Sequence, residues 1–212
     1  EIKADWNIFA ADVEDEFHVT DVAMAWSLES ADAQKVLPKH VSENVIRAVQ
    51  AVDNGVFAMC QDEELAWMVE TSSNIASVQS SENEIVCVTS QRSNVMSNLK
   101  NIANSVKAVF ELAGATVVMN EGYPAWKMRK GSKLQKVTVD AYRKLFGKDP
   151  IVKGIHAGLE CGLFSEKYPE LDMVSFGPTL RFVHTPDERL LIPTVQMVWD
   201  HLLEVLKNIP EK

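Results

Sequence analysis

Residues 69–119 carry the pattern that most constrains how this chain folds. Two strand candidates, 69–79 and 84–90, are joined by four polar residues that suit a hairpin turn. A helix follows, because apolar residues step by three and four from Val95 to Ala113, and Gly114 then supplies a C-terminal stop. The β-branched residues of 116–119 predict a further strand. Hairpin, helix and strand in this order indicate a mixed α/β fold.

The residues before the hairpin add two helices and a strand to this prediction. Apolar residues at helical spacing predict a helix over 1–17, and alternation from Val22 to Leu28 predicts a strand. After a polar loop, Ser42 is expected to cap a second helix that stops at 53–55. Helix, strand, hairpin, helix and strand make up most of a ferredoxin-like α/β sandwich that lacks its first strand.

The helical spacing begins at the first residues of the chain. Ile2, Trp6 and Phe9 already belong to the apolar stripe, with no capping residue ahead of them. Helices normally begin with a cap that satisfies their free N–H groups. We therefore expect residue 1 to lie inside a longer protein.

A change of composition near residue 125 predicts a domain boundary. Residues 121–126 break the pattern and 127–133 form a basic, glycine-containing run, although a solvated loop within one domain would look similar. We therefore divide the chain into domains 1–125 and 126–212. In the second, we expect a helix over 134–145 ending at Gly147, a strand at 151–155 and a short helix from about Leu159. A strand at 173–176 and a last helix that starts near Pro193 complete it.

Net charge, hydropathy and cysteine content indicate which partners this protein is expected to bind and in which compartment it is expected to lie. The net charge of −9 disfavours nucleic acid, which needs a basic binding surface. No apolar run approaches the roughly 20 residues of a membrane span. Three cysteines are an odd number without the spacing of a disulfide framework, which favours a reducing compartment. We therefore expect a cytoplasmic protein.

His184 is the first candidate for chemistry. It follows an apolar run and precedes Thr185 and Glu188, which have the spacing of a capping box. A rigid neutral imidazole is a common metal ligand, and Asp187 or Glu188 could orient it. A hydrogen-bonded surface histidine is the alternative, and spacing alone favours it because no second His or Cys lies at a ligand-like offset.

The segment from His156 to Glu160 is the second candidate. Gly158 lies between these two residues, so a strand-to-helix turn is expected, with free N–H groups that suit a carboxylate or oxyanion. A structural turn with a salt-bridged Glu160 is equally compatible with the sequence. Cys161 could be a thiol nucleophile with His156 or His184 as its base, but the glycine spacing of a nucleophile elbow is missing and a buried packing role is favoured.

Other polar side chains are weaker candidates. Arg92 lies between a strand and a helix N-terminus, where a guanidinium can hold a carboxylate with two hydrogen bonds, although a surface arginine is more common. His18, His40 and His201 lie in polar or amphipathic surroundings and are expected to be solvated.

Four segments together resemble a known family. They are HAGLECGLF at 156–164, FGPTLRFVHTPDE at 176–188, EGYPAWK at 121–127 and VETSSNIA at 69–76. They are similar to the C-terminal half of aminoacyl-histidine dipeptidases, also called Xaa-His or cytosolic non-specific dipeptidases, which are two-zinc metallopeptidases. The resemblance implies a ferredoxin-like lid that mediates homodimerisation and a catalytic α/β domain that binds two Zn²⁺. It also implies hydrolysis of unblocked dipeptides such as β-alanyl-histidine.

The resemblance also suggests roles for individual residues. His184 matches a metal ligand, Arg92 matches the lid arginine that binds the substrate carboxylate, and Asn74 matches a lid position that faces the cleft. His156, Gly158 and Glu160 match the loop that lines the substrate pocket. The family's other metal ligands and its general base have no counterpart here, so this chain alone is expected to be inactive. A non-catalytic α/β binding or dimerisation module and a thiol hydrolase are the alternatives.

Overall fold

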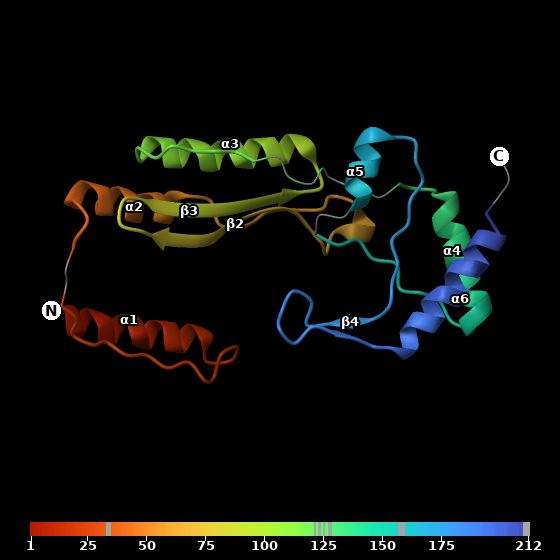
Figure 1. The fold of residues 1–212 in the computed structure, drawn as a ribbon, viewed down its shortest axis with the longest axis horizontal. Helices are drawn as coiled ribbons and strands as arrows, with labels where there is room; N and C mark the ends of the chain where they lie inside the picture. Colours follow the sequence, from red (N-terminus) through yellow and green to blue (C-terminus); the bar gives the residue numbers. More distant parts are fainter. Residues whose placement is uncertain are drawn as a thin grey trace. The chain divides into compact units, whose positions relative to one another are not determined.

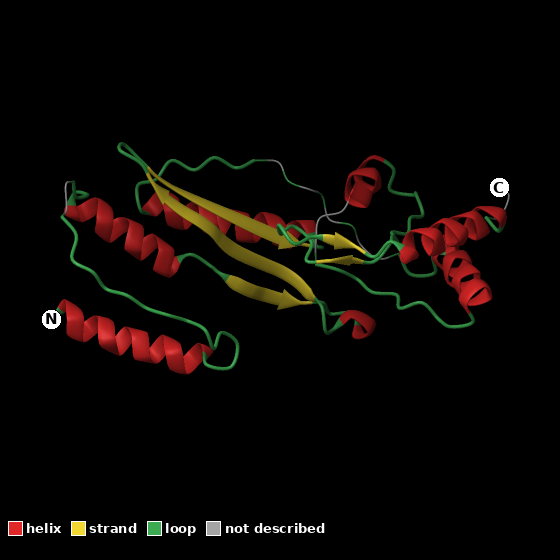
Figure 2. Cartoon of the chain, turned by 60° about the horizontal axis from the view of Figure 1, so that its bottom comes forward, coloured by secondary structure: helices red, strands yellow, loops and turns green. Residues whose placement is uncertain are grey.

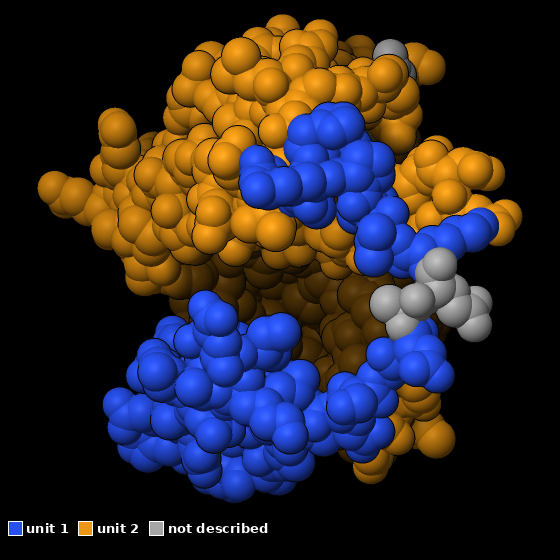
Figure 3. Space-filling view, turned by 90° about the vertical axis from the view of Figure 1, so that its left-hand side faces the viewer, with its two compact units in different colours: residues 1–43 blue, residues 44–212 orange. Residues whose placement is uncertain are grey.

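The computed structural model describes residues 1–32, 35–120, 122, 124, 126, 129–156 and 160–209. They form a mixture of helices and antiparallel strands, which confirms the mixed α/β fold class (Figure 1). Two compact units are present, 1–43 and 44–212, and Figure 3 colours them separately. Of the helices among the described residues, none has the combination of length and apolar character that crossing a membrane requires.

The first unit contains the predicted N-terminal helix. Helix α1 spans Ile2–Phe17, as its apolar stripe indicates. The strand expected at 22–28 is wrong, because these residues form turn and coil. Trp26 instead packs edge-on against Trp6 and Phe9, with ring centroids 6.1 Å apart in both pairs. Trp26 of this segment thus contacts α1, while Val22 and Leu28 are exposed and form no sheet face.

A three-stranded antiparallel sheet forms the centre of the second unit (Figure 2). Strands β2, Val69–Ser80, and β3, Ile85–Ser93, confirm the predicted hairpin, and β1, Gly55–Met59, pairs with the other side of β2. Strand β1 was not predicted from the sequence. A short 3-10 helix, Glu63–Leu65, lies between β1 and β2. The resulting order is β1-β2-β3, with β3 at an edge.

Two helices share a hydrophobic core with one face of the hairpin. Helix α2, Lys39–Ala51, begins before the expected cap at Ser42, and α3, Met96–Leu112, runs along the hairpin in Figure 1. The core contains Ala48, Val52, Val106 and Phe110, with partly buried Ile75 of β2 and Cys87 of β3 against it. Because strand side chains alternate, Thr71 and Ser73 face this core side, while Ser72 and Asn74 face the other.

The end of α3 is set by Gly114, as predicted, with a φ of +86° that suits glycine. The strand expected at 116–119 is wrong, because the segment is coil. Its Val117 packs against the helix–sheet core without joining the ladder, while Thr116 and Val118 are exposed.

The C-terminal part contains three predicted helices. They are α4, Lys133–Phe146, α5, Glu160–Lys167, and α6, Pro193–Lys207. Ser132 caps α4 by accepting a hydrogen bond from the Gln135 N–H at 2.9 Å, and Gly147 ends it with a φ of +67°. Strands β4, Leu180–Arg181, and β5, Arg189–Leu190, form a short hairpin.

The strands expected at 151–155 and 173–176 are wrong. Both segments are coil, and Ile151 is 82% exposed. The described sheets consist of β1–β3 and β4–β5, so neither segment has a ladder in which to pair. Apolar composition alone therefore does not make these residues strands.

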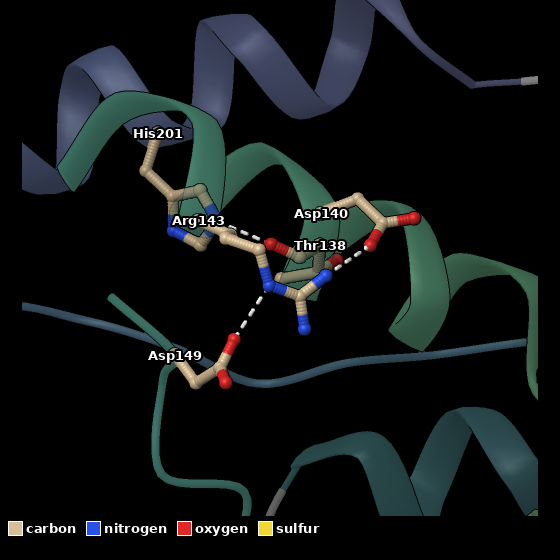
Figure 4. Close-up of polar contacts among 5 residues, drawn as sticks. All are labelled: Thr138, Asp140, Arg143, Asp149 and His201. Carbon is tan, nitrogen blue, oxygen red and sulfur yellow. Dashed lines mark hydrogen bonds and ion pairs between the residues drawn. The ribbon is translucent and has the colours of Figure 1, made fainter. Parts of the chain in front are cut away.

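Helices α4 and α6 pack around a buried histidine (Figure 4). The expectation that His201 is solvated is wrong, since it is 5% exposed and its Nε2 lies 2.8 Å from the Thr138 carbonyl oxygen. Its ring contacts Tyr142, Phe146 and Phe176. His18 and His40 are exposed, as expected.

Candidate active site

The structure brings Arg92 and His156 together through Ser72. Ser72 and Arg92 are directly opposite each other in the β2–β3 ladder, so both side chains lie on the same face of the sheet. His156 Nε2 lies 2.7 Å from Ser72 Oγ, although the two residues are 84 positions apart in the chain. Two of the residues predicted to contact substrate thus meet on the face opposite the hydrophobic core.

The pKa of the His156 imidazole is lowered from its ordinary value. Its partial burial lowers its pKa, the nearby charge of Arg92 lowers the pKa further, and a hydrogen bond with the Val69 backbone opposes part of this effect. A neutral imidazole has one acceptor nitrogen, which suits the Ser72 hydroxyl as a donor. Arg92 itself is exposed, so its guanidinium can bind an anion from solution.

Asn74 lies on the same strand face as Ser72, two positions further along β2. It is exposed and pairs with Ser90 in the ladder. Its amide is therefore presented on the surface that carries Arg92.

The segment from His156 to Glu160 differs from the expected strand-to-helix turn, because residues 151–155 before it are coil and not a strand. Gly158 lies outside the described residues. Glu160 is the first residue of α5 and is exposed. A Cβ atom at Gly162 would overlap the carbonyl of Pro124, so this glycine allows α5 to approach Pro124 closely.

Cys161 is partly buried, which fits the packing role that the sequence favours. Among the hydrogen bonds of the described residues, His156 is joined to Ser72 and not to this thiol.

His184 lies in the turn between β4 and β5. The expected capping box forms no helix start; the segment is a turn in which Glu188 N–H donates to the Thr185 carbonyl at 3.1 Å. Glu188 Oε2 accepts a hydrogen bond from the backbone N–H of His184 at 2.8 Å. This carboxylate therefore orients the main chain of His184 and not its imidazole.

The backbone of this turn has two unusual conformations. Phe182 and His184 have φ values of +54° and +65°, in the left-handed region that costs energy for side chains other than glycine. The Thr185 hydroxyl donates to the Phe182 carbonyl at 2.7 Å, and the Arg189 guanidinium lies 5.2 Å from the centre of the Phe182 ring. These contacts fix the turn and leave the His184 side chain exposed.

Comparison with known proteins shows what these segments are similar to. No family model matches the chain. The cytosol non-specific dipeptidase of Escherichia coli K12 is 37% identical over 170 residues, which cover 80% of this chain and 35% of that protein. The crystal structure of aminoacylhistidine dipeptidase from Vibrio alginolyticus matches 97% of this chain with a TM-score of 0.77 and 36% identity. The chain is similar to these dipeptidases over part of their length.

The relationship to the dipeptidases covers only part of their length. The chain spans about a third of the Escherichia coli dipeptidase, in its C-terminal half, and 42% of the Vibrio alginolyticus chain. The resemblance expected from the sequence is therefore confirmed for that half. Aminopeptidase PepT of Bacillus cereus also matches, with a TM-score of 0.57 at 18% identity over 78% of this chain and 44% of its own, and shows a shared fold alone.

The described residues of this chain do not form a metal site by themselves. No three His, Cys, Asp or Glu side chains of the described residues converge as a metal-binding group. His184 offers one exposed imidazole, and a tetrahedral zinc site needs further protein ligands. The residues present could supply one ligand, but not a complete site.

Ser72 belongs to the candidate site but was not predicted from the sequence. Serine in a strand carries no signal of its own, and its contact with His156 depends on the register of the hairpin. A predicted register could have placed it on the face of Arg92, but only with the bulge between Ile75 and Ser77 included.

Proposed function

We propose that this chain is the lid and the C-terminal catalytic segment of a dipeptidase that hydrolyses unblocked dipeptides of the Xaa-His type, such as β-alanyl-histidine. The lid would comprise residues 1–125 and the catalytic segment 126–212. The observation that carries the proposal is the match of 97% of the chain to an aminoacylhistidine dipeptidase at 36% identity. The meeting of Arg92 and His156 on one surface supports it from the geometry.

In this proposal, Arg92 binds the C-terminal carboxylate of the dipeptide. An exposed guanidinium can make two parallel hydrogen bonds to a carboxylate, and these are stronger than bonds between neutral groups. Asn74 would contact the same end of the substrate from β2. His156, Gly158 and Glu160 would line the pocket, with the pKa of His156 lowered by burial and by the nearby guanidinium.

His184 would contribute one ligand to a zinc site. Such an ion, when bound, would activate water and polarise the peptide carbonyl. The other ligands and the general base would come from the part of the dipeptidases that this chain does not match. Residues 1–212 alone are therefore expected to be inactive.

The lid is also the proposed surface for a homodimer. Strand β3 lies at the edge of the sheet and carries the exposed apolar residues Val86 and Val88, which a second copy could cover. A cytoplasmic location is proposed as well, in keeping with the similarity to the cytosol non-specific dipeptidase of Escherichia coli.

Replacement of Arg92 tests the proposed function. In the protein at its natural length, we expect Arg92→Ala to lower kcat/KM for a dipeptide by about 10–100-fold, the size of a lost charged hydrogen-bonded contact. The C-terminal amide of the same dipeptide should be affected much less, because it lacks the carboxylate. Arg47→Ala, which removes an exposed arginine of α2, is the matched control. Equal losses for dipeptide and amide would contradict the assigned role.

A further inference from the structure

The hydrogen bond between Ser72 and His156 fixes a side chain that its own segment leaves unsupported. Residues 151–155 belong to neither described sheet, and Ile155 is exposed. The main chain approaches the sheet region at Gly154, where a Cβ atom would crowd the side chain of Met68. Beyond that contact, the imidazole is oriented by the 2.7 Å bond to Ser72 Oγ together with a hydrogen bond to the Val69 backbone.

The position of Ser72 determines where this imidazole lies. Ser72 is half-buried in the central strand of the sheet and directly opposite Arg92. A ring anchored to Ser72 therefore lies beside the guanidinium, close enough for the charge of Arg92 to act on it. The anchor also joins a residue of the proposed lid to one of the proposed catalytic segment.

We propose that Ser72 is a positioning residue of the dipeptide site, whose hydroxyl holds the His156 imidazole against β2 as the pocket wall beside Arg92. This inference rests on the proposed function. Ser72 need not contact the substrate; it acts through His156. A loosened ring would leave the pocket less well formed for the ground state and the transition state alike, so binding should suffer more than turnover.

A pair of substitutions that differ by one hydroxyl tests this role. Threonine and valine have nearly the same shape and both suit a strand, so Ser72→Thr and Ser72→Val separate the hydroxyl from packing and folding effects. In the protein at its natural length, we expect Ser72→Val to raise KM for a dipeptide about 3–10-fold, with kcat changed less than about twofold. Ser72→Thr should keep KM near that of the wild type. Ser80→Ala, at the far end of β2, is the control.

A double-substitution experiment shows whether Ser72 acts through His156. If it does, adding Ser72→Val to His156→Ala should raise KM no further, because the group that Ser72 positions is already gone. The imidazole ¹⁵N shifts of His156, measured by NMR, should change in Ser72→Val and be restored in Ser72→Thr. A purely structural role predicts additive effects in the double variant and no rescue by threonine.

The outcomes separate this inference from the proposed function. If Arg92→Ala affects a dipeptide and its amide equally, the proposed function fails. If Arg92→Ala behaves as expected but Ser72→Val keeps the wild-type KM, or still weakens binding in the His156→Ala background, only the positioning role of Ser72 is overturned.

Discussion

Truncation of His201 should strongly destabilise the C-terminal helices. His201 is buried between α4 and α6, where its Nε2 lies 2.8 Å from the Thr138 carbonyl oxygen. Its ring also packs against Tyr142, Phe146 and Phe176, with centroids 4.7–6.5 Å away. His201→Ala removes the hydrogen bond and the ring together, whereas His201→Phe removes the hydrogen bond and keeps a ring of similar size.

The two substitutions should differ in magnitude. A neutral hydrogen bond contributes about 1 kcal/mol, and the Thr138 carbonyl can keep its bond within α4, so His201→Phe should cost about 1 kcal/mol. Truncating a buried aromatic ring to alanine costs about 3–5 kcal/mol, and the imidazole is smaller than a phenyl ring. We therefore expect His201→Ala to lower the free energy of unfolding by about 3 kcal/mol.

Urea denaturation followed by circular dichroism measures both losses. With a slope of about 2 kcal/mol per molar urea, the midpoint of His201→Ala should fall by about 1.5 M. His40→Ala removes an exposed histidine of α2 and should change the free energy of unfolding by less than about 0.5 kcal/mol. A loss below about 1 kcal/mol for His201→Ala would refute the buried packing, and equal losses for alanine and phenylalanine would refute the division between ring and hydrogen bond.

Two further predictions concern a ligand and a charge. His184→Ala should lower the zinc content of the protein at its natural length, measured by elemental analysis, and His40→Ala should not; unchanged stoichiometry would remove His184 from the metal site. Hydrogen bonds from Lys144 and Asn208 lower the pKa of Glu204 despite an opposing contribution from burial. The stability from this ionised form is present above the ordinary pKa of about 4.5 and is lost as pH falls through the folded-state value. Glu204→Gln should therefore flatten the acid limb of the stability–pH curve, and an unchanged limb would contradict this.

The helices of this chain could be predicted because their signals are local. Apolar spacing indicated α1, α3, α4 and α6, and glycines marked the ends of α3 and α4 where the structure has positive φ values. The β2–β3 hairpin was predicted for the same reason, since both strands and their turn lie within one short stretch.

Isolated strands could not be predicted with the same success, because a strand exists only with a partner. Residues 22–28, 116–119, 151–155 and 173–176 have suitable composition, yet their apolar side chains pack on helices or remain exposed. Strand β1 has weak composition and forms because β2 offers it a free edge. His201 was misjudged for a related reason: burial by α4 and α6 is a tertiary contact, and the residues flanking it on α6 gave no sign of it.

In the candidate site, a shift of one residue in the strand register decides which serine contacts His156, and this shift could not be predicted from the sequence. The pairing next to the turn, Ser80 with Ile85, would by simple continuation place Ser73 opposite Arg92. The bulge between Ile75 and Ser77 shifts the register by one residue and places Ser72 there instead. A shift of one residue exchanges the two faces of a strand, so Ser73 faces the core and Ser72 meets His156. The resemblance to dipeptidases could indicate Arg92 and His156 separately, but the bulge decides which serine joins them. Removing that extra residue, by deleting Ala76, should therefore disturb the Ser72–His156 contact more than any substitution on the outer end of the hairpin.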